Sequence, residues 1–148
     1  MPEANSPKTS AEIRKLCTTL QGVDFLHRLK VHDLDVLVSA MVKRSYKAGA
    51  TVIKQGAKGD EFYIVASGKL SVWVKRGFKN VQIDTRWPEQ YFGEMALVSN
   101  QPRMATIKTE EASELYVLSK DQFNQSLMAN PAIAAGIQKV IAERRAKS

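Results

Sequence analysis

The sequence predicts a mainly β fold with flanking helices, and three observations lead to this prediction. From position 46 to position 119, short runs rich in β-branched and aromatic residues recur, most of them bounded by glycine: TVIKQG, EFYIVASG, KLSVWVKRG, VQID, ATIKT and ELYVL. No helical pattern separates most of these runs, which favours a small antiparallel barrel or jelly roll over a parallel α/β sheet. Apolar residues recur at helical spacing before and after this region.

The length and composition are typical of one soluble domain. A chain of 148 residues with 44% hydrophobic residues can bury one core, and it has no apolar run long enough to span a membrane. Cys17 is the only cysteine and no secretory leader pattern opens the sequence, so we expect a cytoplasmic location. The net charge of +7 suits an anionic partner, but the cations at 43–44 and 75–79 are spread along the chain and are interpreted as a solvated face.

Two helices are predicted ahead of the strands. Residues 1–9 lack apolar periodicity and are interpreted as a flexible lead-in. Residues 10–45 form the predicted helical segment, because apolar side chains fall at helical spacing in two series on either side of Gly22. These series are Ile13, Leu16 and Leu20, then Leu34, Leu37, Val38, Met41 and Val42.

The run LSVWV shows the alternation of a strand with one face in a core. One face carries Leu70, Val72 and Val74. The opposite face carries Ser71 and Trp73. The strands of residues 46–119 are therefore expected to enclose a core, and a ligand would lie inside it.

Helical signals return after the last strand. Ser119 and Gln122 have the spacing of a capping box, and Asn130-Pro131 is expected to end the helix that follows. A final amphipathic helix is predicted from the spacing of Ile133, Ile137, Val140 and Ile141. Residues 120–148 are thus predicted to be helical.

The segment 92–106, FGEMALVSNQPRMAT, breaks the strand periodicity and carries the candidate chemistry. Gly93 is expected to start one or two helical turns, whose free N–H groups attract anions. Small side chains at Ala96 and Ala105 let a ligand approach the backbone. Arg103 offers a planar fork that suits phosphate oxygens, and Glu94 offers an acceptor for sugar hydroxyls. The pair suits a ligand with a phosphate and a ribose.

From about Phe25 to its final helix, the sequence resembles the cyclic nucleotide-binding domains, in particular those of cAMP-dependent protein kinase regulatory subunits. The resemblance centres on the family's phosphate-binding cassette, F-G-E-x-A-L followed by P-R-x-A-T, which stands here at 92–97 and 102–106. GATVIKQGAKGDEFYIVASG, residues 49–68, is similar to the family's early strands. The resemblance implies an eight-stranded antiparallel jelly-roll barrel over 46–119, with N-terminal helices and a hinge and lid helices over 120–148.

The resemblance also implies roles for individual residues. Glu94 would bind the ribose 2′-hydroxyl, while Arg103 and the amides near Ala96 and Ala105 would hold the cyclic phosphate. The implied ligand-binding set is Gly93, Glu94, Met95, Ala96, Arg103, Met104, Ala105, Val72 and Val74. The implied supporting residues are Asp60, behind Arg103, and Leu97, which would relay ligand occupancy to Phe123 and Leu127. The implied lid residues, one of which would cover the base, are Ile137, Val140 and Ile141.

Met104 bears on the choice of base. Family members that prefer cGMP usually carry threonine or serine at this position, whose hydroxyl reaches the guanine amino group. Methionine has no hydroxyl, and an unpartnered guanine edge costs about 1 to 3 kcal/mol. The expected ligand is therefore cAMP, with cGMP second. Trp87-Pro88-Glu89 replaces the glycine-rich turn common before the cassette and is expected to reshape the pocket rim.

Binding without catalysis is the expected function, and no cofactor or metal is expected. His32-Asp33 invites comparison with metal phosphohydrolases, but only His27 and His32 are present, and Asp33 is interpreted as a helix N-cap. Too few residues follow Ile137 for a helix-turn-helix, so sequence-specific DNA binding is not expected. The expected partner is a kinase catalytic domain or another domain of a longer chain. A degenerate domain, binding another purine or no nucleotide and serving as a protein-interaction surface, is the alternative.

Overall fold

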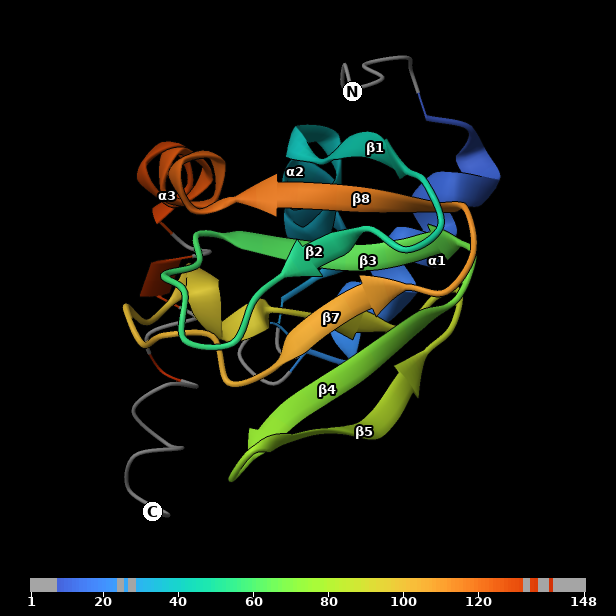
Figure 1. Cartoon of the computed structure of the whole chain (residues 1–148). Coiled ribbons are helices and arrows are strands. Elements are labelled where there is room, and N and C mark those ends of the chain that lie inside the picture. The colour runs from blue at the N-terminus through green and yellow to red at the C-terminus, as the bar shows by residue number, and fades with distance from the viewer. Residues whose placement is uncertain (1–7, 24–25, 27–28, 132–133, 136–138, 140–148) are drawn as a thin grey trace.

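The computed structural model describes residues 8–23, 26, 29–131, 134–135 and 139 (Figure 1). Two helices precede the strands: α1 (Ser10–Gln21) and α2 (Val31–Ala40). The strands are β1 (Val42–Tyr46), β2 (Thr51–Ile53), β3 (Glu61–Ser67), β4 (Leu70–Arg76), β5 (Lys79–Arg86), β6 (Tyr91–Phe92), β7 (Thr106–Thr109) and β8 (Ser113–Ser119). A 3-10 helix, η2 (Glu94–Leu97), lies between β6 and β7, and α3 (Lys120–Ala129) follows β8.

The described strands form two four-stranded sheets in which every neighbouring pair is antiparallel. One sheet has the order β1-β8-β3-β6 and the other the order β2-β7-β4-β5. The mainly β, jelly-roll fold with flanking helices is thereby confirmed. Residues 92–106 connect β6 of the first sheet to β7 of the second, so the cassette is a crossover between the sheets.

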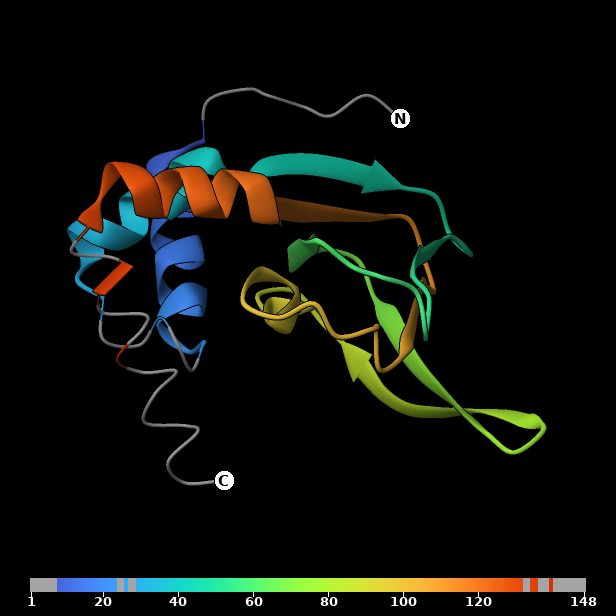
Figure 2. The same cartoon turned by 90° about the vertical axis from the view of Figure 1, so that its left-hand side faces the viewer.

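Strand β3 is apolar on both faces because it lies between two cores. Phe62 and Ile64 belong to a cluster with α1, α2 and α3, whereas Tyr63 and Val65 belong to a cluster shared with the second sheet. This position explains why EFYIVAS reads as a continuous apolar run instead of an alternating one. In Figure 2 the helices gather on one side of the molecule, and the β4–β5 hairpin extends from the opposite side.

The predicted capping box at the start of α3 is confirmed. Ser119 Oγ accepts a hydrogen bond from the Gln122 amide at 3.1 Å, and α3 ends at Ala129, just before Asn130-Pro131. The prediction that Asp33 is an N-cap is wrong, because α2 begins at Val31 and Asp33 occupies its third position. From there the Asp33 carboxylate accepts a hydrogen bond from the Lys30 amide at 3.4 Å. Asp33 therefore stabilises the start of α2 from within the first turn, instead of from the position before the helix.

Several predicted boundaries differ from the observed ones. Strand β1 occupies 42–46, so the strands begin before position 46 and within the segment predicted to be helical. Apolar spacing misplaced this boundary because Met41 and Val42 also fit the helical series. β6, only two residues long, was not predicted. A register shift between Val72 and Trp73 interrupts the predicted alternation, and Val74 lies beyond it. No helix among the described residues is long and apolar enough to cross a membrane.

Candidate functional site

A cavity of about 890 Å³ opens where the cassette crosses between the sheets. Eight of the nine residues predicted from the cassette and β4 lie in its lining: Gly93, Glu94, Met95, Ala96, Arg103, Met104, Ala105 and Val72. Ile53 and Ile107 of the second sheet add apolar walls. Val74 is partly buried and is not among the lining residues. The structure therefore gathers the cassette around one hollow.

Gly93 turns the chain from β6 into η2. Its φ of 79° lies in the left-handed region, which favours glycine. A Cβ at this position would lie 2.9 Å from Arg103 Nη1 and 3.0 Å from the Glu61 carbonyl oxygen. The glycine therefore serves both the turn and the close approach of Arg103. The helical turn predicted after Gly93 is observed as η2, and its second residue, Met95, is exposed.

Arg103 is held in place by β3 and the loop before it. Its Nη2 donates a hydrogen bond to the Glu61 carbonyl at 2.8 Å, and its guanidinium carbon lies 6.0 Å from the centre of the Tyr63 ring. The Arg103 amide donates to the Ala57 carbonyl at 2.8 Å, and the Gly56 amide donates to the Arg103 carbonyl at 2.8 Å. Within the described residues, no ion pair joins Arg103 to a carboxylate.

The backbone hydrogen bonds thus leave the Arg103 charge available to a ligand. Glu94 is in a similar position, because its partly buried carboxylate has no hydrogen bond or ion pair among the described residues. An acid and a base that line one cavity without pairing with each other are both available to a ligand. Glu94 and Arg103 do not form the ion pair that would be expected if their role were only to hold a turn.

A polar cluster lies behind Arg103. The Glu61 carboxylate accepts two hydrogen bonds from the Arg44 guanidinium, at 2.9 and 3.2 Å, and one from the Tyr63 hydroxyl at 2.7 Å. Burial raises the pKa of Glu61, but the hydrogen bonds from Arg44 and Tyr63 and the nearby charges of Arg44 and Arg103 outweigh it, so the pKa lies below its ordinary value. Arg44 also donates to the Tyr46 hydroxyl at 3.1 Å. These contacts tie β1 to the strand that holds Arg103.

Sequence reasoning missed Glu61 and Arg44 and chose Asp60 instead. The Asp60 side chain is exposed and makes no ion pair with Arg103 in the described structure, while its carbonyl accepts a hydrogen bond from the Lys120 amide at 2.7 Å. The available signal for Glu61 was a charged residue that opens the apolar strand EFYIVAS. Gly59 also matters, because a Cβ there would lie 1.9 Å from Arg103 Nε.

The cassette helix packs toward α3. Leu97 is 2% exposed and belongs to the same core cluster as Phe123, with Leu127 packed against that cluster. The three residues named for the relay therefore lie in one core. Met104 is 81% exposed although it lines the cavity, which places it at the rim. The lid candidates Ile137, Val140 and Ile141 lie outside the described residues.

Helix α1 contributes to the cavity, which the sequence did not predict. Arg14, Lys15, Thr18 and Thr19 lie in the lining. The Thr19 hydroxyl donates to the Glu89 carbonyl at 3.0 Å, and the Tyr91 hydroxyl donates to the Gly22 carbonyl at 3.3 Å. Glu89 itself has a positive φ of 74°, so the 87–90 turn takes a conformation unusual for a residue with a side chain. The turn expected to reshape the rim is thus the segment on which α1 docks.

Metal ligands do not gather anywhere in the part of the chain that the structure describes. No group of three or more histidine, cysteine, aspartate or glutamate side chains is placed to hold a metal ion there. Cys17 is buried, and its thiol donates a hydrogen bond to the Asp35 carboxylate at 3.4 Å. Burial, together with Asp35, raises the pKa of this thiol to about 11, which makes it a poor nucleophile at neutral pH.

Comparison with known proteins agrees with this geometry. The family model of the cyclic nucleotide-binding domain matches residues 43–130. The cAMP-dependent protein kinase type II regulatory subunit of Drosophila melanogaster is 30% identical over 122 residues, which are 82% of this chain and 31% of that protein. The cGMP-dependent protein kinase of Eimeria tenella is 35% identical over 122 residues, which are 82% of this chain and 12% of that protein. The chain thus spans less than a third of the length of either relative.

A solved structure shows the same arrangement of elements. The regulatory domain of Toxoplasma gondii PKA, crystallised with cAMP, is similar with a TM-score of 0.71 and 29% identity, over 80% of this chain and 46% of that one. The family model covers more than half of the 148 residues, and the cassette resemblance coincides with the lining of the cavity. The chain therefore belongs to the cyclic nucleotide-binding domain family.

Proposed function

We propose that this domain binds cAMP in preference to cGMP and works as a regulatory or sensor module without catalysis of its own. The observation that carries the proposal is the pair of unneutralised side chains in one cavity, Glu94 and Arg103. A cyclic phosphate would meet the guanidinium, and a ribose hydroxyl would donate to the carboxylate. Val72 and Ile107 offer apolar contacts to the base.

The preference for cAMP rests on Met104 at the rim of the cavity. Its thioether cannot donate a hydrogen bond, so guanine would lose a partner that a hydroxyl could provide. The loss is about 1 to 3 kcal/mol, or roughly one to two decades of affinity. The relatives named above include both a cAMP-dependent and a cGMP-dependent kinase, so family membership leaves the choice to this residue.

Signalling would pass from the cassette to the C-terminal segment. Leu97, Phe123 and Leu127 share one core, so a shift of η2 on ligand binding changes the surface on which α3 rests. Ile137, Val140 or Ile141 would then cover the base. A ligand shifts such an equilibrium only by binding the closed form more tightly than the open form. The receiving partner would be a kinase catalytic domain or another domain of a longer chain.

Calorimetry with cAMP, cGMP and adenosine tests the proposal. We expect cAMP to bind most tightly, and Arg103→Ala to weaken cAMP binding roughly 10- to 150-fold, because a charge-assisted contact contributes about 1.5 to 3 kcal/mol. Lys54→Ala, which removes an exposed charge outside the cavity, is the matched control and should bind as the wild type does.

Two results would contradict the proposal. Heat from none of the three ligands would favour the degenerate, protein-binding alternative. Adenosine binding as tightly as cAMP, with Arg103→Ala unaffected, would favour a domain that recognises a purine and no phosphate.

A further inference from the structure

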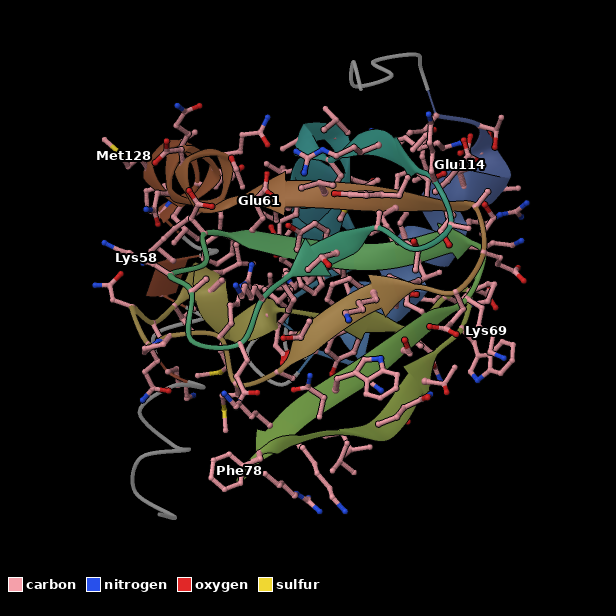
Figure 3. All side chains as sticks on the ribbon, viewed as in Figure 1. Lys58, Glu61, Lys69, Phe78, Glu114 and Met128 are labelled. Carbon is pink, nitrogen blue, oxygen red and sulfur yellow. The ribbon has the colours of Figure 1, made fainter. Side chains whose placement is uncertain are left out.

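The β4–β5 hairpin ends in an aromatic side chain that packs against none of the described residues. Gly77, with a φ of 63°, and Phe78 connect the two strands, and Phe78 is fully exposed at 102% relative accessibility. Figure 2 shows the hairpin extending from the side of the molecule opposite the helices, and Figure 3 shows Phe78 at its outer end, pointing away from the ribbon. A phenylalanine in this position has no structural use within the described chain.

The same tip carries three exposed cations. Lys75, Arg76 and Lys79 surround Phe78 in the sequence KRGFK, and all three are exposed. Arg76 and Lys79 are direct cross-strand partners, so two like charges face each other, which is unfavourable unless an anion lies between or near them. Residues 75–80 contain no acidic residue, and none of the three cations forms an ion pair with a described residue.

The chemistry of the tip selects the occupant. A protein partner needs about 800 Å² of complementary surface on each side, and one projecting side chain with three cations does not supply it. A single-stranded nucleic acid needs a groove that follows its backbone. A fluid bilayer needs neither, because it accepts one inserted aromatic ring and attracts nearby cations diffusely.

We propose that the β4–β5 tip, residues 75–80, docks on bilayers rich in anionic phospholipids, with Phe78 inserted at the interface and Lys75, Arg76 and Lys79 near the headgroups. From the sequence alone, these cations are interpreted as part of a solvated face. The hairpin gathers them around an aromatic ring. Val72, which lines the cavity, lies on the same β4 strand, so the docked hairpin would hold the cavity at a fixed distance from the membrane.

Vesicle sedimentation tests this surface. The full chain is mixed with vesicles of phosphatidylcholine alone or with a third phosphatidylserine, at low and high salt. We expect binding only to the anionic vesicles, and weaker binding at high salt because exposed charges are screened. Arg76→Gln/Lys79→Gln should weaken binding about 25-fold, at about fivefold for each charge. The control Lys47→Gln/Lys54→Gln removes the same amount of charge at other exposed positions and should change vesicle binding little.

Phe78 separates insertion from simple charge attraction. Phe78→Ser should weaken binding to anionic vesicles about tenfold, whereas Phe78→Trp should retain it, because both aromatic rings suit the interface. Circular dichroism checks that each variant is folded. Sedimentation measures vesicle binding alone, so its outcome does not depend on nucleotide binding. Equal binding to neutral vesicles, no binding to either, or equal loss from the control pair would overturn the proposal. So would tip-dependent binding to a single-stranded oligonucleotide without binding to vesicles.

Discussion

A methyl group at position 59 would occupy the space of the Arg103 guanidinium. The Cβ of an alanine there would lie 1.9 Å from Nε, 2.2 Å from Cζ and 2.7 Å from Cδ of Arg103. Gly59 is not among the glycines with positive φ, so alanine fits its backbone and the strain falls on the arginine. Gly59→Ala should therefore displace the Arg103 side chain and leave the fold intact.

The size of the effect follows from what Arg103 would lose. A displaced guanidinium gives up its hydrogen bond to the Glu61 carbonyl and its reach into the cavity. One charge-assisted hydrogen bond contributes about 1.5 to 3 kcal/mol, so cAMP affinity should fall roughly 10- to 150-fold. Thermal stability should change little, because the lower entropy of the unfolded chain with alanine offsets the lost hydrogen bond.

Isothermal titration calorimetry with cAMP, in a double-mutant cycle, checks this reasoning. Gly59→Ala acts by displacing the Arg103 side chain, which is absent in an Arg103→Ala background. Adding Gly59→Ala to Arg103→Ala should therefore cause no further loss of cAMP affinity. Wild-type affinity in Gly59→Ala would show that Arg103 does not hold the phosphate from its observed position. An equal loss in both backgrounds would show that residue 59 acts through another group.

Other side chains near the site and at the anchor of α1 also give defined expectations. Arg44→Gln removes the bidentate partner of Glu61 and should lower the free energy of unfolding by about 1 to 2 kcal/mol in urea titrations. Its cAMP affinity should fall less than that of Arg103→Ala. The reverse order would contradict a supporting role for Arg44. Met104→Thr adds a hydroxyl and should shift the cGMP-to-cAMP affinity ratio about tenfold toward cGMP in calorimetry, and an unchanged ratio would remove Met104 from base selection. The pKa of Glu12 is lowered from 4.5 to about 2 by hydrogen bonds from the Thr9 amide, the Tyr116 hydroxyl and Lys43. The charged form therefore stabilises the fold above pH 4.5. This contribution is lost as the pH falls toward 2. The melting temperature of Glu12→Gln should therefore lie below that of the wild type near neutral pH and converge with it in acid, whereas a constant difference would mean that the charge is not responsible.

The cassette could be predicted from the sequence because its residues are contiguous. Positions 92–106 carry the turn glycine, the acid, the base and the small side chains within one segment, and the structure places them around one cavity. The strand runs were predictable for a similar reason, since β-branched composition and bounding turns are local signals. β6 escaped prediction because two residues hold no periodicity.

The support behind the cassette depends on tertiary contacts, which local pattern does not encode. Glu61 and Arg44 meet because β3 and β1 both pair with β8. Asp60 and Glu61 are adjacent and equally charged, and only the position of the chain at the start of β3 decides which of them faces Arg44. The place of α1 in the cavity likewise depends on the contact between Thr19 and the 87–90 turn.

Two consecutive peptide carbonyls connect Arg103, at the wall of the cavity, to the start of α3. The Glu61 carbonyl accepts from Arg103, and the Asp60 carbonyl just before it accepts from the amide of Lys120, the first residue of α3. Any movement of the guanidinium toward a ligand therefore pulls on a peptide whose neighbour anchors the helix. The amide resonance of Lys120 is thus a natural spectroscopic reporter of whether the arginine is engaged, readable even when the receiving partner is absent.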